Sequence, residues 1–251
     1  LEAASSQLTN SSTTETINDI ASPIVIGLAE IAISENIKVN YIIEYASAGI
    51  ARGLVEAYSK NSLDVFQSIT KASAGVVASA IEFSLDIGYD IDEVVSAVGS
   101  GYLAGTIEAS NEFEIDVVEA VEACSRGLIV GTLNTTLDSN VENYETLAST
   151  CEGIAEAAVE ASVREQLDLI KQITAASLGA VKSAVETATT LSLDISSTQK
   201  AILMGLKRGI LDSIPGKGNN IRIMIAPQKD INPYELTNAL ENGINRGGLN
   251  A

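Results

Sequence analysis

The sequence predicts an all-α protein: an antiparallel array of helical repeats that ends in a small strand and helix. Two observations predict this fold. Seven glycines recur at a strict interval of 26 residues through most of the 251-residue chain. An apolar stripe with helical spacing accompanies them in each copy. Self-similarity at a fixed period of this length is typical of repeat architectures.

The glycines define the repeat. The column consists of Gly49, Gly75, Gly101, Gly127, Gly153, Gly179 and Gly205. A second column four residues later holds Gly, Ser or Ala, and a third column, seven residues after the glycines, holds mostly Glu. Carried backwards, the period places Pro23, Gly27 and Glu30 in an atypical first copy. We therefore expect about eight 26-residue repeats, from near Thr13 to near Asn219.

Each repeat is predicted to form one helix of about 18–21 residues. In the copy that holds Gly49, Val39, Ile43, Ala46 and Ile50 step by three and four residues and mark one helix face. An acidic residue begins or precedes each stripe, and this position favours an N-cap. These acidic residues are Asp64, Asp90, Asp116, Glu142, Asp168 and Asp194.

Consecutive helices are predicted to run antiparallel. A helix of 20 residues is about 30 Å long, whereas a linker of five or six residues spans about 20 Å at most and cannot return the chain to the starting end. The stretch VREQLDLIKQ at 163–172 contains neither Gly nor Pro. We predict a break there, and one continuous helix through the stretch is the alternative.

Small residues at the centre of each helix indicate close helix packing. Glycine in a helix interior costs about 1 kcal/mol relative to alanine, and small-xxx-small spacing offsets this cost by letting two backbones approach. Such spacing also occurs in membranes, but charged residues in every helix and the lack of an apolar run of 18 residues favour packing in water. The wide apolar faces leave a bundle, a solenoid and burial against other subunits as alternatives.

The two ends of the chain differ from the repeats. Residues 1–12 are rich in Ser and Thr and predict a flexible polar arm, followed by the repeat domain at 13–213 and a C-terminal extension at 214–251. Within the extension, Ile221–Ile225 alternates like a strand, and Pro233–Ile244 is a predicted helix with Pro in its first turn. A lone strand needs a partner, either the N-terminal arm or a neighbouring subunit.

Composition argues against several classes of function. The net charge of −18 disfavours binding to nucleic acid and to anionic membranes. The chain contains no histidine, so it lacks the commonest general base and metal ligand. The GKGNN stretch at 216–220 lacks the pattern of a phosphate-binding loop. We predict no enzymatic activity, no catalytic residues and no cofactor.

The glutamate column is the main candidate for chemistry. It contains Glu56, Glu82, Glu108, Glu160 and Glu186. We expect each carboxylate to accept hydrogen bonds from backbone N–H groups or hydroxyls at the start of a neighbouring helix. The alternatives are a ladder of carboxylates that binds Ca²⁺, for which no EF-hand loop is present, and a catalytic carboxylate pair. Cys124 and Cys151 fit no metal-binding spacing, and we expect two buried free thiols.

The repeats, the multi-sided apolar faces and the distinct termini predict a structural protein that associates with itself. The expected context is a filament, a sheath or another extracellular or cell-surface assembly. The alternative is a monomeric helical-repeat scaffold that binds a protein or peptide. The column Glu44, Thr70, Ser96, Glu122, Ala148, Thr174 and Lys200 favours this alternative, because a binding face varies where a packing face repeats. An enzyme, and a pore or membrane-surface protein, rank below both.

Overall fold

The computed structural model describes residues 12–60, 64–213 and 233–247, with the backbone alone over 12–22. Nine α-helices lie in these ranges. They are α2 (Ser12–Ser34), α3 (Val39–Lys60), α4 (Val65–Ile87), α5 (Ile91–Glu112), α6 (Val117–Asp138), α7 (Asn143–Arg164), α8 (Leu169–Thr190), α9 (Ile195–Asp212) and α10 (Pro233–Arg246). The predicted arm, apart from residue 12, and the predicted strand at 221–225 fall outside the described residues.

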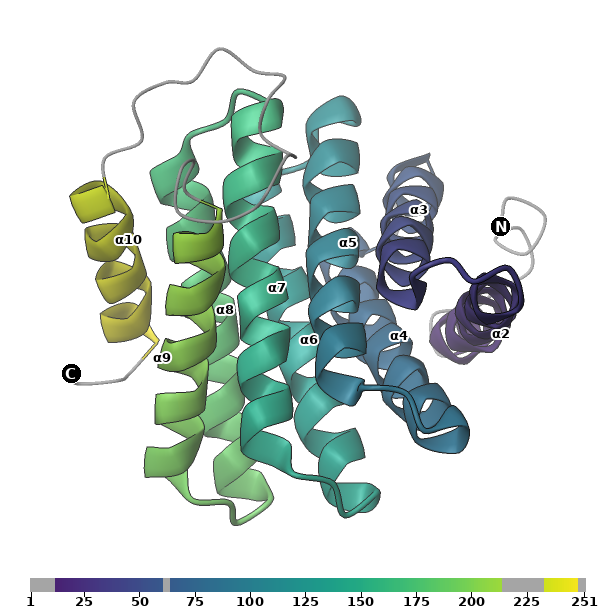
Figure 1. The fold of residues 1–251 in the computed structure, drawn as a ribbon. Coiled ribbons are helices and arrows are strands. Elements are labelled where there is room, and N and C mark those ends of the chain that lie inside the picture. Colours follow the sequence, from purple (N-terminus) through teal and green to yellow (C-terminus); the bar gives the residue numbers. More distant parts are fainter. Residues whose placement is uncertain (1–11, 61–63, 214–232, 248–251) are drawn as a thin grey trace.

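The helices form two layers (Figure 1). Helices α3, α5, α7 and α9 pack side by side in one layer, and α2, α4, α6, α8 and α10 form the other. Consecutive helices lie in different layers and run in opposite directions, so each helix is parallel to the next helix of its own layer. The prediction of an all-α array of antiparallel helices is confirmed.

Acidic caps begin the helices as the sequence predicts. The side chains of Asp64, Asp116, Asp168 and Asp194 each accept a hydrogen bond from the backbone N–H three residues later. Asp90 accepts from the N–H groups two and three residues later. Glu142 stands at the equivalent position of α7 without a side-chain cap bond. The caps satisfy N–H groups that a helix start leaves without partners.

Each described joint contains one residue in the left-handed conformation. Asn36, Gly88, Glu114, Asn140, Gln166 and Ser192 have φ between 53° and 66°. The apolar residue that follows closes the turn by donating its N–H to a carbonyl five residues earlier, as Leu167 does to Ser162 at 2.9 Å. This is a Schellman ending, which stops the helix without needing Gly or Pro. The predicted break within 163–172 is therefore confirmed at Gln166.

Replacing Gln166 by glycine is expected to stabilise the protein by about 0.5–1 kcal/mol. A left-handed conformation costs a residue with a side chain about 1–2 kcal/mol, and glycine avoids most of this cost. Gly88 already holds the equivalent position after α4, with φ of 66°. Urea denaturation followed by circular dichroism measures the difference. The control Gln166→Ala retains a Cβ and should show no such gain, so equal stabilisation by both variants would contradict the explanation.

The glycine column packs each helix onto the helix two positions earlier, within the same layer. A methyl group on Gly101 would overlap the carbonyl of Glu44, and one on Gly153 would overlap the carbonyl of Ser96. The same offset of 57 positions relates Gly127 to Thr70, Gly179 to Glu122 and Gly205 to Ala148. Parallel neighbours are thus shifted by five residues relative to a two-repeat spacing of 52. At each contact, glycine lets a Cα approach a carbonyl oxygen.

Helix α10 joins the array through the same kind of contact. A methyl group on Gly243 would overlap the Cβ of Ser177 and approach the Thr174 carbonyl on α8. The Thr174 hydroxyl donates to the carbonyl of Ala239 at 3.3 Å. Between α4 and α6 of the same layer, the Thr70 hydroxyl likewise donates to the carbonyl of Ala123 at 3.0 Å. Ala239 and Ala123 each precede the packing glycine by four residues, so α10 packs on α8 as α6 packs on α4.

Candidate functional site

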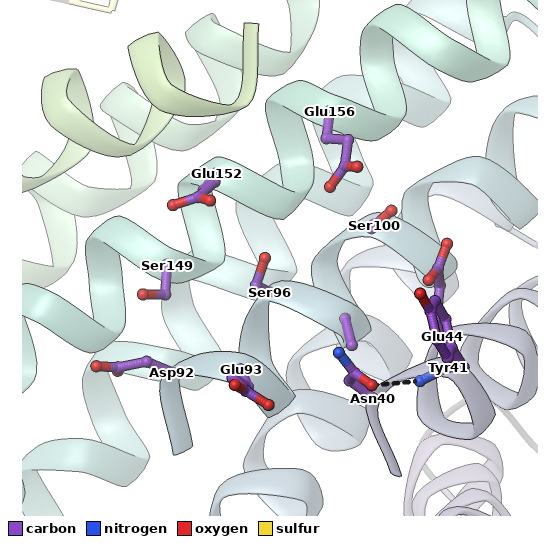
Figure 2. A pocket seen from close by; sticks show the side chains of 11 residues that line it. Asn40, Tyr41, Glu44, Asp92, Glu93, Ser96, Ser100, Ser149, Glu152 and Glu156 are labelled. Carbon is purple, nitrogen blue, oxygen red and sulfur yellow. Dashed lines mark hydrogen bonds between the residues drawn. The ribbon is translucent and has the colours of Figure 1, made fainter. Parts of the chain in front are cut away.

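An acidic groove of about 410 Å³ runs along the outer surface of the layer that contains α3, α5 and α7. Its lining residues are Asn40, Tyr41 and Glu44 from α3; Asp92, Glu93, Ser96, Ala97 and Ser100 from α5; and Ser149, Glu152 and Glu156 from α7. Figure 2 shows Ser96 and Ser100 between Glu44 on one side and the carboxylates of α7 on the other. We refer to this set as the acidic groove.

The groove exists because α5 places small side chains on its outward face. Ser96 and Ser100 lie one turn apart and form the floor. The neighbouring helices carry longer side chains at their outward positions, with Tyr41 on α3 and Glu152 on α7. The glycine contacts hold these walls close to the floor, because Gly101 packs on α3 and α7 packs on α5 through Gly153.

One end of the groove is formed by the first turn of α5. The Asp90 carboxylate caps this helix and accepts from the N–H of Asp92 at 3.0 Å and of Glu93 at 3.3 Å. Asp92 and Glu93 then project from the first turn, where the helix dipole favours negative charge. The sequence therefore concentrates carboxylates here without breaking the helix.

The lining contains five carboxylates and neither Lys nor Arg. Burial raises the pKa of Asp92, and the nearby charges of Asp90 and Glu145 raise it further, whereas the Thr146 hydroxyl and Arg208 lower it. Burial also raises the pKa of Glu152. Burial therefore disfavours the charged form of both carboxyl groups, and a cation placed between them would offset this cost.

Arg208 on α9 marks the edge of the acidic region. Its Nη1 donates to the Oε1 of Glu145 on α7 at 2.9 Å. Burial is the largest cause of the raised pKa of Glu152, and the negative charges of Asp212 and Glu145 raise it further. The positive charge of Arg208 lowers it. The guanidinium therefore compensates the α7 side of the groove, and it is not among the lining residues.

Two serine hydroxyls in the groove have no hydrogen-bond partner within the described part of the chain. Ser100 is 6% exposed and Ser149 is 7% exposed, and both line the groove. Buried hydroxyls in helices usually bond to a carbonyl one turn earlier, as Thr106 does to Tyr102 at 2.8 Å. Ser100 and Ser149 make no such bond, and their hydroxyls are open to the groove.

A metal ion does not fit this arrangement. Among the described residues, no group of three His, Cys, Asp or Glu side chains lies close enough to hold one. The carboxylates are instead spread over three helices, which suits a ligand that carries several positive charges or N–H donors along its length. In the same residues, no helix has the length and apolar character needed to cross a membrane.

The glutamate column lies away from the groove and does not converge. Glu56 pairs with Lys60 at 2.7 Å, and Glu108 pairs with Arg164, the last residue of α7. The expected hydrogen bonds to a neighbouring helix start are thus wrong for these two residues. The reason is that each helix packs on a parallel helix of its own layer. The C-terminal end of α5, which carries Glu108, therefore lies beside the C-terminal end of α7 and not beside a helix start. Glu82 and Glu186 are exposed, and Glu160 is partly buried.

The cysteines match the prediction of buried free thiols. Cys124 and Cys151 are both fully buried and form no disulfide. Burial raises the pKa of Cys124 to about 12 and raises that of Cys151 as well. Both side chains therefore stay in the neutral thiol form at physiological pH and act as small apolar groups of the core.

Sequence reasoning pointed towards the groove without locating it. The column that begins at Glu44, in which the residue type changes from repeat to repeat, contributes Glu44 and Ser96 to the lining. It missed Ser149, Glu152 and Glu156, because only the parallel packing of α3, α5 and α7 brings these three repeats together.

Comparison with known proteins adds no family to this description. No protein-family model matches the chain. The search of curated proteins likewise found no significant match.

Proposed function

We propose that the chain is a structural, non-enzymatic protein that associates with itself, as a subunit of a filament, sheath or other assembly at the cell surface or outside the cell. The observation that carries this proposal is a packing face on α3 that none of the described residues covers at Gly49. Gly49 belongs to the 26-residue column, yet its side-chain position faces open space. The column glycines of α5 to α9 instead meet a neighbouring helix.

The face around Gly49 has the character of an interface. Tyr45 lies one turn before Gly49 and is 74% exposed. In α5 to α9 the same position holds Ala or Ser and is buried. A large, exposed aromatic side chain beside an uncovered glycine is typical of a surface that a partner covers.

Further apolar side chains gather at this end of the array. Among the described residues, the exposed large apolar side chains of α2, of α3 and of the joint between them are Ile24, Leu28, Ile31, Ile33, Ile37, Tyr41 and Tyr45. Exposed apolar patches of this kind mark interaction sites on soluble proteins. Because this type of face packs on other repeats within the chain, a second copy of the chain offers a surface of fitting shape.

The substitution Gly49→Arg tests this contact. Since the position is open, the variant should fold with wild-type helicity and thermal stability. We expect wild-type protein to form oligomers or regular polymers as its concentration rises, in sedimentation velocity and negative-stain electron microscopy with and without Ca²⁺. We expect Gly49→Arg to lose this association. The control Asn134→Arg adds the same charge at an exposed site of α6 and should associate normally.

Either of two results would count against the proposal. Wild-type protein that stays monomeric at every concentration and salt level would exclude self-association as its role. Association that Gly49→Arg leaves unchanged would move the contact away from the α3 face.

A scaffold that binds a protein or peptide is the second candidate function. The acidic groove favours it, because equivalent positions of successive repeats differ there: Glu44 on α3 corresponds to Ser96 on α5, and Ser100 on α5 corresponds to Glu152 on α7. A surface that serves only to repeat a packing contact has no need of such variation.

A further inference from the structure

We propose that the acidic groove receives the basic segment 214–232 of a second copy of the chain. This inference rests on the proposed self-association and names a contact that would build the assembly. The groove supplies carboxylates on three helices, and the hydroxyls of Ser100 and Ser149, two otherwise buried side chains, open into it. A matching ligand must bring positive charges and N–H donors along an extended backbone.

The segment 214–232 carries this chemistry in its sequence. It reads IPGKGNNIRIMIAPQKDIN and contains Lys217, Arg222 and Lys229 against the single acid Asp230. It is therefore net positive in a chain whose overall charge is −18. Its charge is the reverse of the groove's, and this complementarity identifies it as the occupant.

The spacing of the basic residues suits the width of the groove. Arg222 lies five positions after Lys217, and an extended chain covers at most about 17 Å over that length. Parallel helices pack about 8–10 Å apart, so α3 and α7 lie about 16–20 Å apart across α5. An extended segment can therefore set one basic side chain against the α3 wall and the other against the α7 wall.

The contact is assigned to a second copy because the inference rests on the proposed self-association. The segment leaves α9 after Ser213 and returns to the start of α10 at Pro233. Both points lie at the end of the array where α5 and α7 finish, since α9 is parallel to them and α10 runs the opposite way. A connection of 19 residues between these points is long enough to extend to a neighbouring molecule, since each extended residue spans about 3.3–3.6 Å.

This geometry makes the contact heterologous, because a groove on one copy meets a different element on the next. Heterologous contacts that do not close into a ring generate open polymers. The groove and the segment therefore supply what a filament or sheath requires, and the open face on α3 adds a second surface.

A charge-swap experiment tests the proposal. The groove variant Glu93→Lys/Glu152→Lys/Glu156→Lys and the segment variant Arg222→Glu/Lys229→Glu should each weaken self-association roughly tenfold or more in sedimentation velocity, because attraction becomes repulsion. The two variants mixed together should regain association, since each then offers the complement of the other. A chain carrying all five changes should also regain it. The matched control Glu82→Lys/Glu119→Lys/Glu186→Lys makes the same change of charge at exposed sites outside the groove and should associate as wild type.

A synthetic peptide of residues 214–232 separates this inference from the proposed function. We expect the full-length protein to bind the labelled peptide in fluorescence anisotropy, with affinity that falls as salt rises and that is lost in the groove variant. Peptide binding without self-association would overturn the assembly role and retain the groove. Self-association that depends on Gly49 but not on the charge swaps, with no peptide binding, would overturn the groove contact and retain the assembly role.

Discussion

Replacing Gly153 by alanine is expected to destabilise the protein by about 1–3 kcal/mol, although alanine is the better helix former by about 1 kcal/mol. The added methyl group would overlap the Ser96 carbonyl and lie 2.9 Å from the Ser100 nitrogen. Both are backbone atoms inside α5, so the clash can be relieved only by separating two helices. Urea denaturation followed by circular dichroism measures the loss.

The matched control is Gly49→Ala, at the same column position of α3. Its side-chain position is open, so the helix propensity of alanine should act alone and stabilise the protein by about 0.5–1 kcal/mol. The two substitutions are chemically identical and should have opposite signs. If both stabilise, the glycine column does not hold the helices together. If both destabilise, the α3 face is covered by another part of the molecule.

The sequence predicted the helices well because their signals are local. The caps at Asp64, Asp90 and Asp116 and the apolar stripes act within one turn of helix, so each repeat carries its own evidence. The left-handed residues at Glu114 and Gln166 carried no such signal, because neither residue type favours that conformation. There the ending depends on the apolar residue that follows and closes the turn.

The pairing of the helices could not be predicted in the same way. A small residue on a helix face shows that something approaches, but not which helix it is. The glutamate column was assigned to an antiparallel neighbour for this reason, whereas Glu108 meets Arg164 on a parallel one. The shift of five residues between parallel neighbours follows from the packing of whole helix surfaces, which a period counted in the sequence does not contain.

The acidic groove shows the same limit at the level of the site. Glu44, Ser96 and Glu152 are far apart in the chain, and nothing in the sequence of its own repeat distinguishes any of them. They share a surface only because three parallel helices present the same face. The variable column indicated that a face was free to change. The position of Ser100 and Ser149 in the groove became visible only with the packing.

Helix α10 extends this point to the end of the array. Gly243 lies 38 residues after Gly205, so it does not fit the 26-residue period. Residues 214–232 separate the two helices in the sequence. The contact with α8 is nevertheless of the repeat type, with the same threonine-to-carbonyl bond. We therefore regard α10 as a further helix of the array, which 214–232 connects to α9 in the sequence.

The substitution Gly243→Leu is expected to release α10 from the array. The new side chain would overlap Ser177 and the backbone of α8, which cannot move without disturbing α6. Release would expose Leu236, Leu240 and Ile244, each of which contributes about 1.5–3 kcal/mol when fully buried. The measured loss should reach several kcal/mol for this helix, while α3 to α9 remain folded.

Amide hydrogen exchange resolves this effect along the chain. Residues 234–246 should lose protection in Gly243→Leu, with α5 and α7 unchanged. The control Asn242→Leu places the same side chain on the exposed neighbouring position and should leave α10 protected. Gly243→Leu changes neither the basic residues of 214–232 nor the groove. Under the proposed contact, this variant should therefore still associate with another copy. Retained protection of α10 in Gly243→Leu would mean that Gly243 is not needed for the contact with α8.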